Sequence, residues 1–302
     1  MIDIATKIAN LRLKNPTILA SGIMDEDAGS MKRIAECGAG AIVTKSIGLK
    51  PRDGYANPTL VELECGLLNA MGLPNPGIES FKEEIKKLKQ SKIKIIGSIF
   101  GSNASEFTEL AKKMESYGAD AVELNMSCPH AKGYGLEIGS DPKLVNGITS
   151  KVKRAINIPV FVKISPNLMN IVEIAKAAER GKADAIVAIN TVKAMKIDLD
   201  LKMPVLANKI GGYSGRAIKP IGVRCVYEIS ENVKIPIIGV GGITNGEDAL
   251  EYMIAGASAV QIGSGLYYRE IDIFKKVCKE IQNWMKKNNY NNLSELVGVA
   301  HK

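Results

Sequence analysis

Residues 103–125 read NASEFTELAKKMESYGADAVELN, and this stretch contains one complete unit of the fold. Apolar residues in its first part recur at the i, i+3, i+4 spacing of a buried helix face, and Gly118 is placed to end the helix. They are Phe107, Leu110, Ala111, Met114 and Tyr117. The run AVELN that follows is short and mostly apolar, as is typical of a buried strand. The stretch therefore predicts a helix followed directly by a strand.

Runs like AVELN recur along the chain, and eight of them can be counted. They are TILAS (17–21), AIVTKS (41–46), KIIGSIF (94–100), AVELN (121–125), PVFVKI (159–164), AIVAIN (185–190), PIIGV (236–240) and SAVQIG (258–263). Runs that are apolar on both faces suit strands covered on both sides, and the intervening lengths suit helices that join parallel neighbours. Eight strand-helix units in 302 residues match a (β/α)8 TIM barrel of the α/β class better than an open doubly wound sheet.

The domain organisation follows from what separates these units. No linker rich in Pro, Gly or Ser and no shift in composition divides the sequence, so we predict a single barrel domain over residues 1–302. Two connections are longer than the rest, residues 48–77 after the second strand and residues 191–219 after the sixth. Long loops that follow barrel strands usually build the functional site.

Composition excludes several classes of protein. Hydrophobic residues make up 46% and charged residues 24%, which argues against disorder, collagen and coiled coil. The net charge of +8 comes from lysines mixed with acidic residues, as in KEEIKKLKQSKIK (82–94), and only 5% of residues are aromatic, so a nucleic-acid groove is disfavoured. The apolar runs are too short to cross a bilayer, and MIDIATKIANLRLKNP at the start is not a secretory signal. We therefore expect a cytoplasmic protein that does not bind membranes.

The cysteines and histidines are too few and too scattered to suggest a metal site. The five cysteines are odd in number and scattered without a CxxC pair, which argues against disulfides, zinc and a self-contained iron–sulfur cluster. They are Cys37, Cys65, Cys128, Cys225 and Cys278. With only two histidines, His130 and His301, a histidine-based metal site or triad is also disfavoured, and we predict no metal.

In a TIM barrel the functional face lies at the carboxyl ends of the strands, and here those ends are polar. Gly241 and Gly242 follow the seventh strand, and Gly263 and Ser264 follow the eighth. Such barrels bind phosphate at these two positions on backbone N–H groups, so we expect a phosphorylated ligand. The spacing is not GxGxxG, because Thr244 occupies the third glycine position, and a Rossmann site is disfavoured. Tight turns alone are the alternative explanation of these glycines.

Three further side chains at the strand ends are candidates for chemistry. Lys163 ends an apolar run and should point into the barrel mouth, as should Lys45. For each, the alternatives are a surface lysine, an internal ion pair or a lysine that forms a Schiff base. Cys128 lies in a loop after the fourth strand, where it is either an inert thiol or a base or nucleophile.

The segment LNMSCPHAKGYG (124–135) resembles the active-site loop N-x-S-C-P-N of the class 1 dihydroorotate dehydrogenases. The other family motifs follow in the same order along almost the whole chain. They are TILASG (17–22), TKS (44–46), LLNAMGLPNPG (67–77), FVKISPN (161–167), INT (189–191), GGYSGRAIKP (211–220), GVGGI (239–243) and IGSG (262–265). The resemblance implies a TIM barrel that carries FMN and oxidises dihydroorotate to orotate in pyrimidine synthesis.

The resemblance also implies roles for individual residues. Cys128 would remove a proton from C5 of dihydroorotate while the hydride at C6 passes to N5 of FMN, and Lys163 would lie beside the flavin. FMN contacts are implied at Ser21, Gly22, Lys45, Ser46, Asn125, Lys163, Ile189, Gly215, Gly241, Gly242, Gly263 and Ser264. Substrate contacts are implied at Lys45, Asn69, Ala70, Met71, Gly72, Leu73, Asn125, Asn190 and Thr191. Two positions depart from the family pattern, since His130 replaces an Asn and Ser98 stands where an Asn near the flavin is expected.

Within class 1, two segments of the sequence are similar to the 1B type, KGYGLEIGSDP (132–142) and NAMGLPNPG (69–77). That likeness implies a partner subunit with FAD and a 2Fe–2S cluster that reduces NAD, around a homodimer of this chain in a heterotetramer. The alternatives are a fumarate-dependent 1A enzyme or another FMN barrel oxidoreductase. From other classes, a barrel lyase with Lys163 as Schiff base and a non-catalytic binding barrel are also open.

Overall fold

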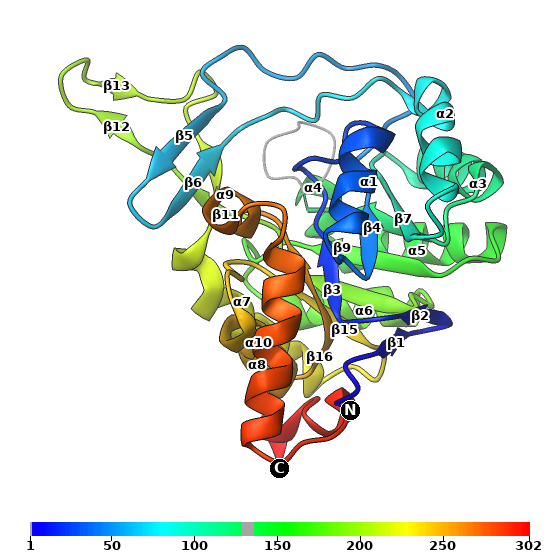
Figure 1. Ribbon diagram of the computed structural model, residues 1–302. Helices are drawn as coiled ribbons and strands as arrows, with labels where there is room; N and C mark the ends of the chain where they lie inside the picture. The colour runs from blue at the N-terminus through cyan, green and yellow to red at the C-terminus, as the bar shows by residue number, and fades with distance from the viewer. Residues whose placement is uncertain (1, 128–135) are drawn as a thin grey trace.

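The computed structural model describes residues 2–127 and 136–302, and its centre is a closed barrel of eight parallel strands (Figure 1). The strands are β3 (Thr17–Leu19), β4 (Ala41–Val43), β7 (Lys94–Ile99), β8 (Ala121–Asn125), β9 (Val160–Ile164), β10 (Ala185–Ala188), β15 (Ile237–Val240) and β16 (Ala257–Ile262). Each falls within or overlaps one of the eight predicted runs, and β16 closes the barrel by pairing with β3. The predicted TIM barrel is confirmed.

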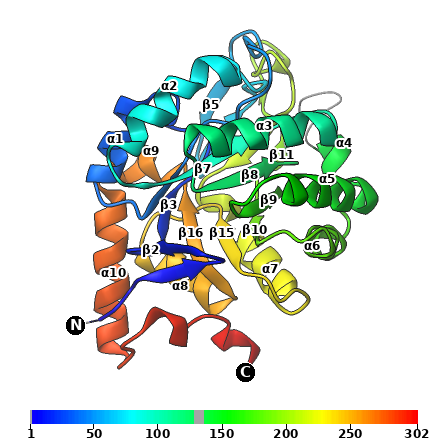
Figure 2. The ribbon, with the colours of Figure 1, turned by 90° about the vertical axis from the view of Figure 1, so that its right-hand side faces the viewer.

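Helices surround the barrel on its outside (Figure 2). The longer ones are α1 (Ala28–Glu36), α2 (Ile78–Lys89), α3 (Ala104–Tyr117), α5 (Pro142–Ala155), α6 (Ile171–Arg180), α7 (Lys219–Ser230), α8 (Gly246–Ile254) and α10 (Ile273–Lys287). The short ones are α4 (Leu136–Gly139), α9 (Gly265–Arg269), η1 (Arg216–Ile218), η2 (Leu293–Glu295) and η3 (Val299–His301). Among the helices that the structure describes, none has both the length and the apolar composition that a membrane span requires.

Helix α3 shows why the sequence between two strands folds as it does. The Asn103 side chain caps its start by accepting hydrogen bonds from the backbone N–H groups of Ser105 and Glu106. Gly118 ends it in the left-handed region at φ 105°, where glycine has no steric penalty. The helix therefore begins and ends where the sequence predicts.

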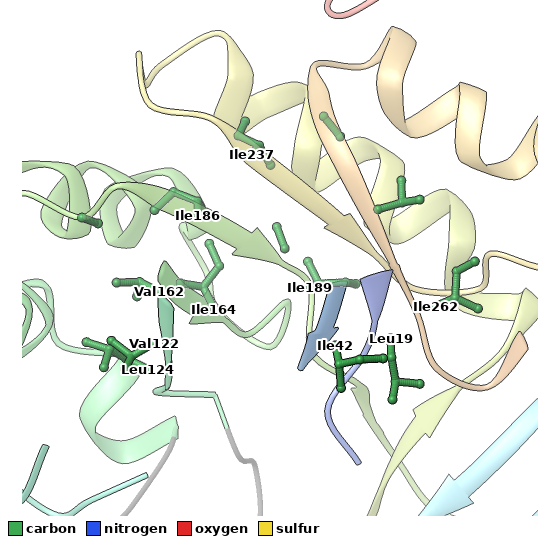
Figure 3. Close-up of a cluster of buried hydrophobic side chains, with 14 of the residues drawn as sticks. Leu19, Ile42, Val122, Leu124, Val162, Ile164, Ile186, Ile189, Ile237 and Ile262 are labelled. Atoms are coloured by element: carbon green, nitrogen blue, oxygen red, sulfur yellow. The ribbon is translucent and has the colours of Figure 1, made fainter. Parts of the chain in front are cut away.

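Side chains of the strands alternate between two cores. Val122, Leu124, Val162 and Ile164 point outward and pack against the helices, as Figure 3 shows. Their neighbours point into the barrel, where an apolar cluster including Phe161 fills the interior. The barrel end opposite the carboxyl ends of the strands is closed by an N-terminal hairpin of β1 (Thr6–Ile8) and β2 (Leu11–Leu13), whose Ile8, Leu11 and Leu13 join this inner cluster.

The two long connections are not plain loops, as the sequence suggested, but pair with each other. Residues 48–77 contain β5 (Leu60–Leu63) and β6 (Gly66–Asn69), and residues 191–219 contain β11 (Val192–Ala194) and β14 (Gly211–Ser214). These form one antiparallel sheet in the order β11-β14-β6-β5 at the end of the barrel away from the termini (Figure 1). A small hairpin of β12 (Ile197–Asp198) and β13 (Met203–Pro204) extends from it. The antiparallel sheet thus forms one side of the mouth of the barrel.

Candidate active site at the mouth of the barrel

A cavity of about 400 Å3 opens at the carboxyl ends of the barrel strands, with the antiparallel sheet on one side. It is the place where we expected the functional site, and most of the predicted residues line it. These are Ser21, Gly22, Lys45, Ser46, Asn69, Met71, Gly72, Leu73, Asn125, Lys163, Ile189, Asn190, Thr191, Gly241, Gly242, Gly263 and Ser264. Residues from seven strand ends and from both long connections therefore meet in one cavity.

Three predicted site residues are not among this lining. The side chain of Ala70 is buried in a separate cluster with Leu68 and Leu206, so it faces away from the cavity. Gly215 does not line the cavity but lies behind Gly242, to which its carbonyl is close. Cys128, like His130, lies outside the described residues.

A chain of hydrogen bonds fixes the polar groups on one side of the cavity. The Oγ atoms of Ser46 and Ser98 lie 2.8 Å apart, and Asn125 Nδ2 donates to Ser46 Oγ at 3.0 Å. Asn125 Oδ1 accepts from Ser127 Oγ at 3.0 Å, and Asn190 Nδ2 donates to that same Ser127 hydroxyl at 2.7 Å. Because each partner is buried or half-buried, the two amides are held in one orientation. Ser98, for which the sequence predicted no role, belongs to this chain of hydrogen bonds.

Lys163 forms part of the cavity floor and also has an internal partner. Its side chain is 7% exposed, and its Nζ lies 3.6 Å from Glu123 Oε1 and 3.4 Å from Gln261 Oε1. Gln261 lines the cavity as well, whereas Glu123 lies below it and is fully buried. Two of the alternatives for Lys163, a cavity residue and an internal ion pair, are thus both realised. Sequence reasoning missed Glu123 and Gln261, although the alternation within AVELN and SAVQIG turns both inward.

Lys45 also lines the cavity, but its ion-pair partner is exposed to solvent. Its Nζ donates to Glu26 Oε1 at 2.6 Å, and the Glu26 side chain is 70% exposed. An ion pair with one partner so open to water contributes little to stability. The Lys45 ammonium can therefore exchange this partner for an anionic group of a ligand.

The glycine turn after β15 has the shape of a phosphate cradle. Gly241 and Gly242 both have positive φ, at 127° and 70°. A Cβ on Gly242 would lie 2.7 Å from the Gly215 carbonyl oxygen and 2.9 Å from Lys219 Cβ, so only glycine fits there. Because these residues have no side chain, the backbone of the turn lines the cavity directly, together with Gly263 and Ser264. These residues fit a phosphate group.

Asp25 is buried beneath the turn that carries Ser21 and Gly22. Its Oδ2 accepts a hydrogen bond from the Gly22 backbone N–H at 2.6 Å, and its Oδ1 has no hydrogen-bond partner among the described residues. Burial raises the pKa of this carboxyl from 3.8 to about 6, against the lowering effect of the Gly22 hydrogen bond and the Lys45 charge. The ionised form of Asp25 is therefore disfavoured in the folded protein.

We expect Asp25→Asn to flatten the pH dependence of stability. Because the pKa is higher in the folded than in the unfolded chain, the contribution of Asp25 is full below about pH 4 and is lost as the pH rises through 6. About two pKa units correspond to about 3 kcal/mol. Urea unfolding of the cofactor-free protein at pH 5 and pH 8 should show a decline in the free energy of unfolding that is about 1.5 kcal/mol smaller in the variant, because about half of the change already occurs below pH 5. An identical decline in both proteins would contradict this interpretation.

Comparison with known proteins identifies the family. The family model described as "Dihydroorotate dehydrogenase" matches residues 3–285. This chain belongs to the dihydroorotate dehydrogenase family. A relative from Methanocaldococcus jannaschii is 57% identical over 300 residues, which cover 98% of this chain and 97% of that protein. One from Thermoplasma volcanium is 55% identical and one from Pyrococcus furiosus 48% identical, each with 100% of both chains covered.

All three relatives are named "Dihydroorotate dehydrogenase B (NAD(+)), catalytic subunit". The sequence prediction of a dihydroorotate dehydrogenase of the B type, an oxidoreductase, is confirmed by this membership. Among solved structures, a DHODH from Eimeria tenella in complex with ferulenol matches with a TM-score of 0.86. It is 22% identical and covers 99% of this chain and 89% of its own, so it supports the barrel fold. Membership of an oxidoreductase family argues against the lyase that would use Lys163 as a Schiff base.

Proposed function

We propose that this chain oxidises dihydroorotate to orotate in pyrimidine synthesis, with FMN as its cofactor. The observation that carries the proposal is one cavity at the mouth of the barrel in which a glycine cradle, two lysines and four amide side chains meet. The family and the names of the relatives support the same reaction. For the electrons, we propose a partner subunit with FAD and a 2Fe–2S cluster that passes them to NAD.

The residues present fit FMN. We propose that backbone N–H groups around Gly241, Gly242, Gly263 and Ser264 bind its phosphate, with Gly215 supporting the cradle from behind. The ring would lie against the floor, and its contacts would come from Ser21, Gly22, Lys45, Ser46, Asn125, Lys163 and Ile189. Bound FMN supplies the acceptor for the C6 hydride. The Lys163 ammonium, desolvated at the floor, stabilises negative charge at that place.

The remaining lining residues suit the substrate. We propose that Asn69, Asn125, Asn190 and Thr191 donate and accept hydrogen bonds with the pyrimidine ring, while Lys45 pairs with the carboxylate. Residues Met71, Gly72 and Leu73 would close the other side. Ala70 is not assigned a side-chain contact, because that side chain is buried elsewhere. We propose Sγ of Cys128 as the base that takes the C5 proton, with Asn125 and Ser127 fixing the chain just before it.

The cradle provides a test of the cofactor assignment that is independent of the substrate. Gly242→Ala places a Cβ against the Gly215 carbonyl at a φ of 70°, a strain of about 1–3 kcal/mol. We expect FMN affinity to fall about 10- to 100-fold, measured by fluorescence titration of the cofactor-free protein. Gly147→Ala is the matched control, because nothing lies within 4 Å of a Cβ added there in α5. Equal FMN affinity in the two variants would contradict a phosphate site at Gly242.

The experiment that tests the function is an anaerobic reduction. The purified chain should show a flavin spectrum, and added dihydroorotate should bleach it. Fumarate and the partner subunit with NAD are then supplied separately, and reoxidation only in the second case is expected. Reoxidation by fumarate would favour the 1A type, and a flavoprotein that dihydroorotate does not bleach would favour another FMN barrel oxidoreductase. A protein that takes up FMN and ligand without any turnover would be a binding barrel.

Three further parts of the proposal concern the protein as a whole. We propose that residues 1–302 form one domain, because the barrel closes between β3 and β16 and Asp3 bridges to Asn292 beside it. We also propose a cytoplasmic location. A homodimer at the core of a heterotetramer is proposed from the family resemblance, and size measurement of the purified chain with and without its partner subunit tests it.

A further inference from the structure

Three polar side chains meet inside the barrel at the floor of the cavity. Glu123 comes from β8, Lys163 from the adjacent strand β9, and Gln261 from β16, which lies on the opposite side of the barrel. Glu123 and Gln261 are fully buried, and Lys163 is nearly so. Below them the interior is apolar. A carboxylate placed there loses most of its hydration, which costs free energy unless other groups compensate its charge.

The contacts of Glu123 connect the other two residues. Its Oε2 accepts a hydrogen bond from Gln261 Nε2 at 2.6 Å. Its Oε1 lies 3.6 Å from Lys163 Nζ and has no hydrogen-bond partner among the described residues. Because a carboxylate only accepts hydrogen bonds, it fixes which end of the Gln261 amide faces it. The carbonyl end, Oε1, is then left facing Lys163 Nζ, at 3.4 Å.

Glu123 itself does not line the cavity, whereas the two side chains that it contacts do. It therefore makes no contact of its own with a ring bound there. Its negative charge also offsets the positive charge of Lys163, since the two groups interact in a site from which water is excluded. Replacing such a pair with apolar side chains of similar volume is often neutral or stabilising, so stability alone does not explain why it is there.

We propose that Glu123 is a positioning residue for the redox reaction: it orients Lys163 and Gln261 toward the cofactor and lowers the positive potential at the cavity floor. The inference rests on the proposed function, because it assumes a flavin above this floor. Reduction adds negative charge to the ring, and a strongly positive floor would hold the electrons there. Glu123 limits that effect, so that the reduced cofactor passes its electrons on more readily.

The test is the reduction potential of the bound flavin in Glu123→Gln, measured by equilibrium titration with a reference dye and without dihydroorotate. Glutamine keeps the size of the side chain and removes its charge. We expect the ratio of reduced to oxidised flavin at a fixed potential to rise about tenfold, which is about 30 mV for a two-electron couple. A ratio that is unchanged or lower overturns the proposal.

A second comparison separates an effect through Lys163 from a general effect of charge. In a Lys163→Met background, adding Glu123→Gln should raise the ratio by clearly less than tenfold, because the lysine that Glu123 orients is gone and only the direct field of the carboxylate is removed. A rise of about tenfold in this background overturns the proposal, and this comparison remains decisive if Glu123→Gln alone fails to fold. If the wild-type chain binds no FMN at all, the proposed function fails rather than this inference.

Asp120, which lies next to the same strand as Glu123, offers a matched control. It directly precedes β8 at the other end, and its carboxylate pairs with Lys89 at 2.8 Å and Lys94 at 3.0 Å. Asp120→Asn also removes one paired negative charge, but far along the strand from the cavity. We expect it to leave the flavin potential unchanged. A shift equal to that of Glu123→Gln would mean that net charge alone sets the potential, and would overturn the positioning role.

Discussion

Replacing Cys128 with serine is expected to slow the reduction of bound FMN by dihydroorotate about 100- to 10,000-fold at neutral pH. A serine hydroxyl gives up its proton far less readily than a thiol, so little of the variant carries a base that can take the C5 proton. We also expect the pH optimum to move upward. Anaerobic stopped-flow measurement of flavin bleaching between pH 6 and pH 10 provides both the rate and its pH dependence.

The control for this variant is a cysteine outside the site. Cys37 is half-buried at the end of α1, where it caps the helix with its backbone, and Cys37→Ser should reduce FMN at the wild-type rate. If Cys128→Ser also reduces FMN at the wild-type rate, Cys128 is not the base. Retention of normal FMN content in Cys128→Ser is required for the comparison, and absorbance of the bound flavin measures it.

Removing the cation at the cavity floor is expected to have the largest effect on stability. Lys163→Met leaves Glu123 fully buried without its opposite charge. Breaking a buried pair in this way lowers the free energy of unfolding by about 3–5 kcal/mol, because one charge stays desolvated and uncompensated. Urea unfolding of the cofactor-free protein measures the loss, and we expect weaker FMN binding in the same variant.

Two comparisons show whether this loss of stability comes from the buried, unpaired Glu123 carboxylate. The double variant with Glu123→Gln should recover most of the stability, since both charges are then absent. Lys153→Ala removes a lysine whose pair with Asp184 is partly open to solvent, with side chains 30% and 23% exposed. It should cost no more than about 1 kcal/mol. A loss of the same size for Lys153→Ala and Lys163→Met would refute the explanation.

The barrel could be predicted from the sequence because its strands leave a strong local pattern. A strand such as Val160–Ile164 is covered on both sides, so nearly all of its residues are apolar, and the helices between strands show their own spacing. The sheet at the mouth leaves a much weaker pattern. Its strands have three or four residues, and β5 is half exposed. Its pairing depends on contacts between distant segments, such as Asn69 with Gly212, which local patterns do not reveal.

Much of the candidate site could also be predicted, because a TIM barrel gathers the residues that follow its strands. That rule places Lys45, Asn125 and Asn190 at one mouth before any family is considered. It does not reveal which inward-facing residues touch across the interior. Glu123 and Gln261 are 138 positions apart in the chain, and only the closed barrel brings their side chains into contact. For the same reason the sequence does not reveal that Gly215 and Ala70 lie outside the cavity lining.

The contact between Glu123 and Gln261 also bears on how the barrel forms during synthesis. The strand β16 that supplies Gln261 is the last of the eight to leave the ribosome. Until it docks, the Glu123 carboxylate lacks its amide donor, and burying it in a half-finished barrel would be costly. Complete burial of the Glu123 carboxylate is therefore favoured only once β16 has docked. A buried charge that serves the finished site thus also opposes premature collapse of the incomplete chain.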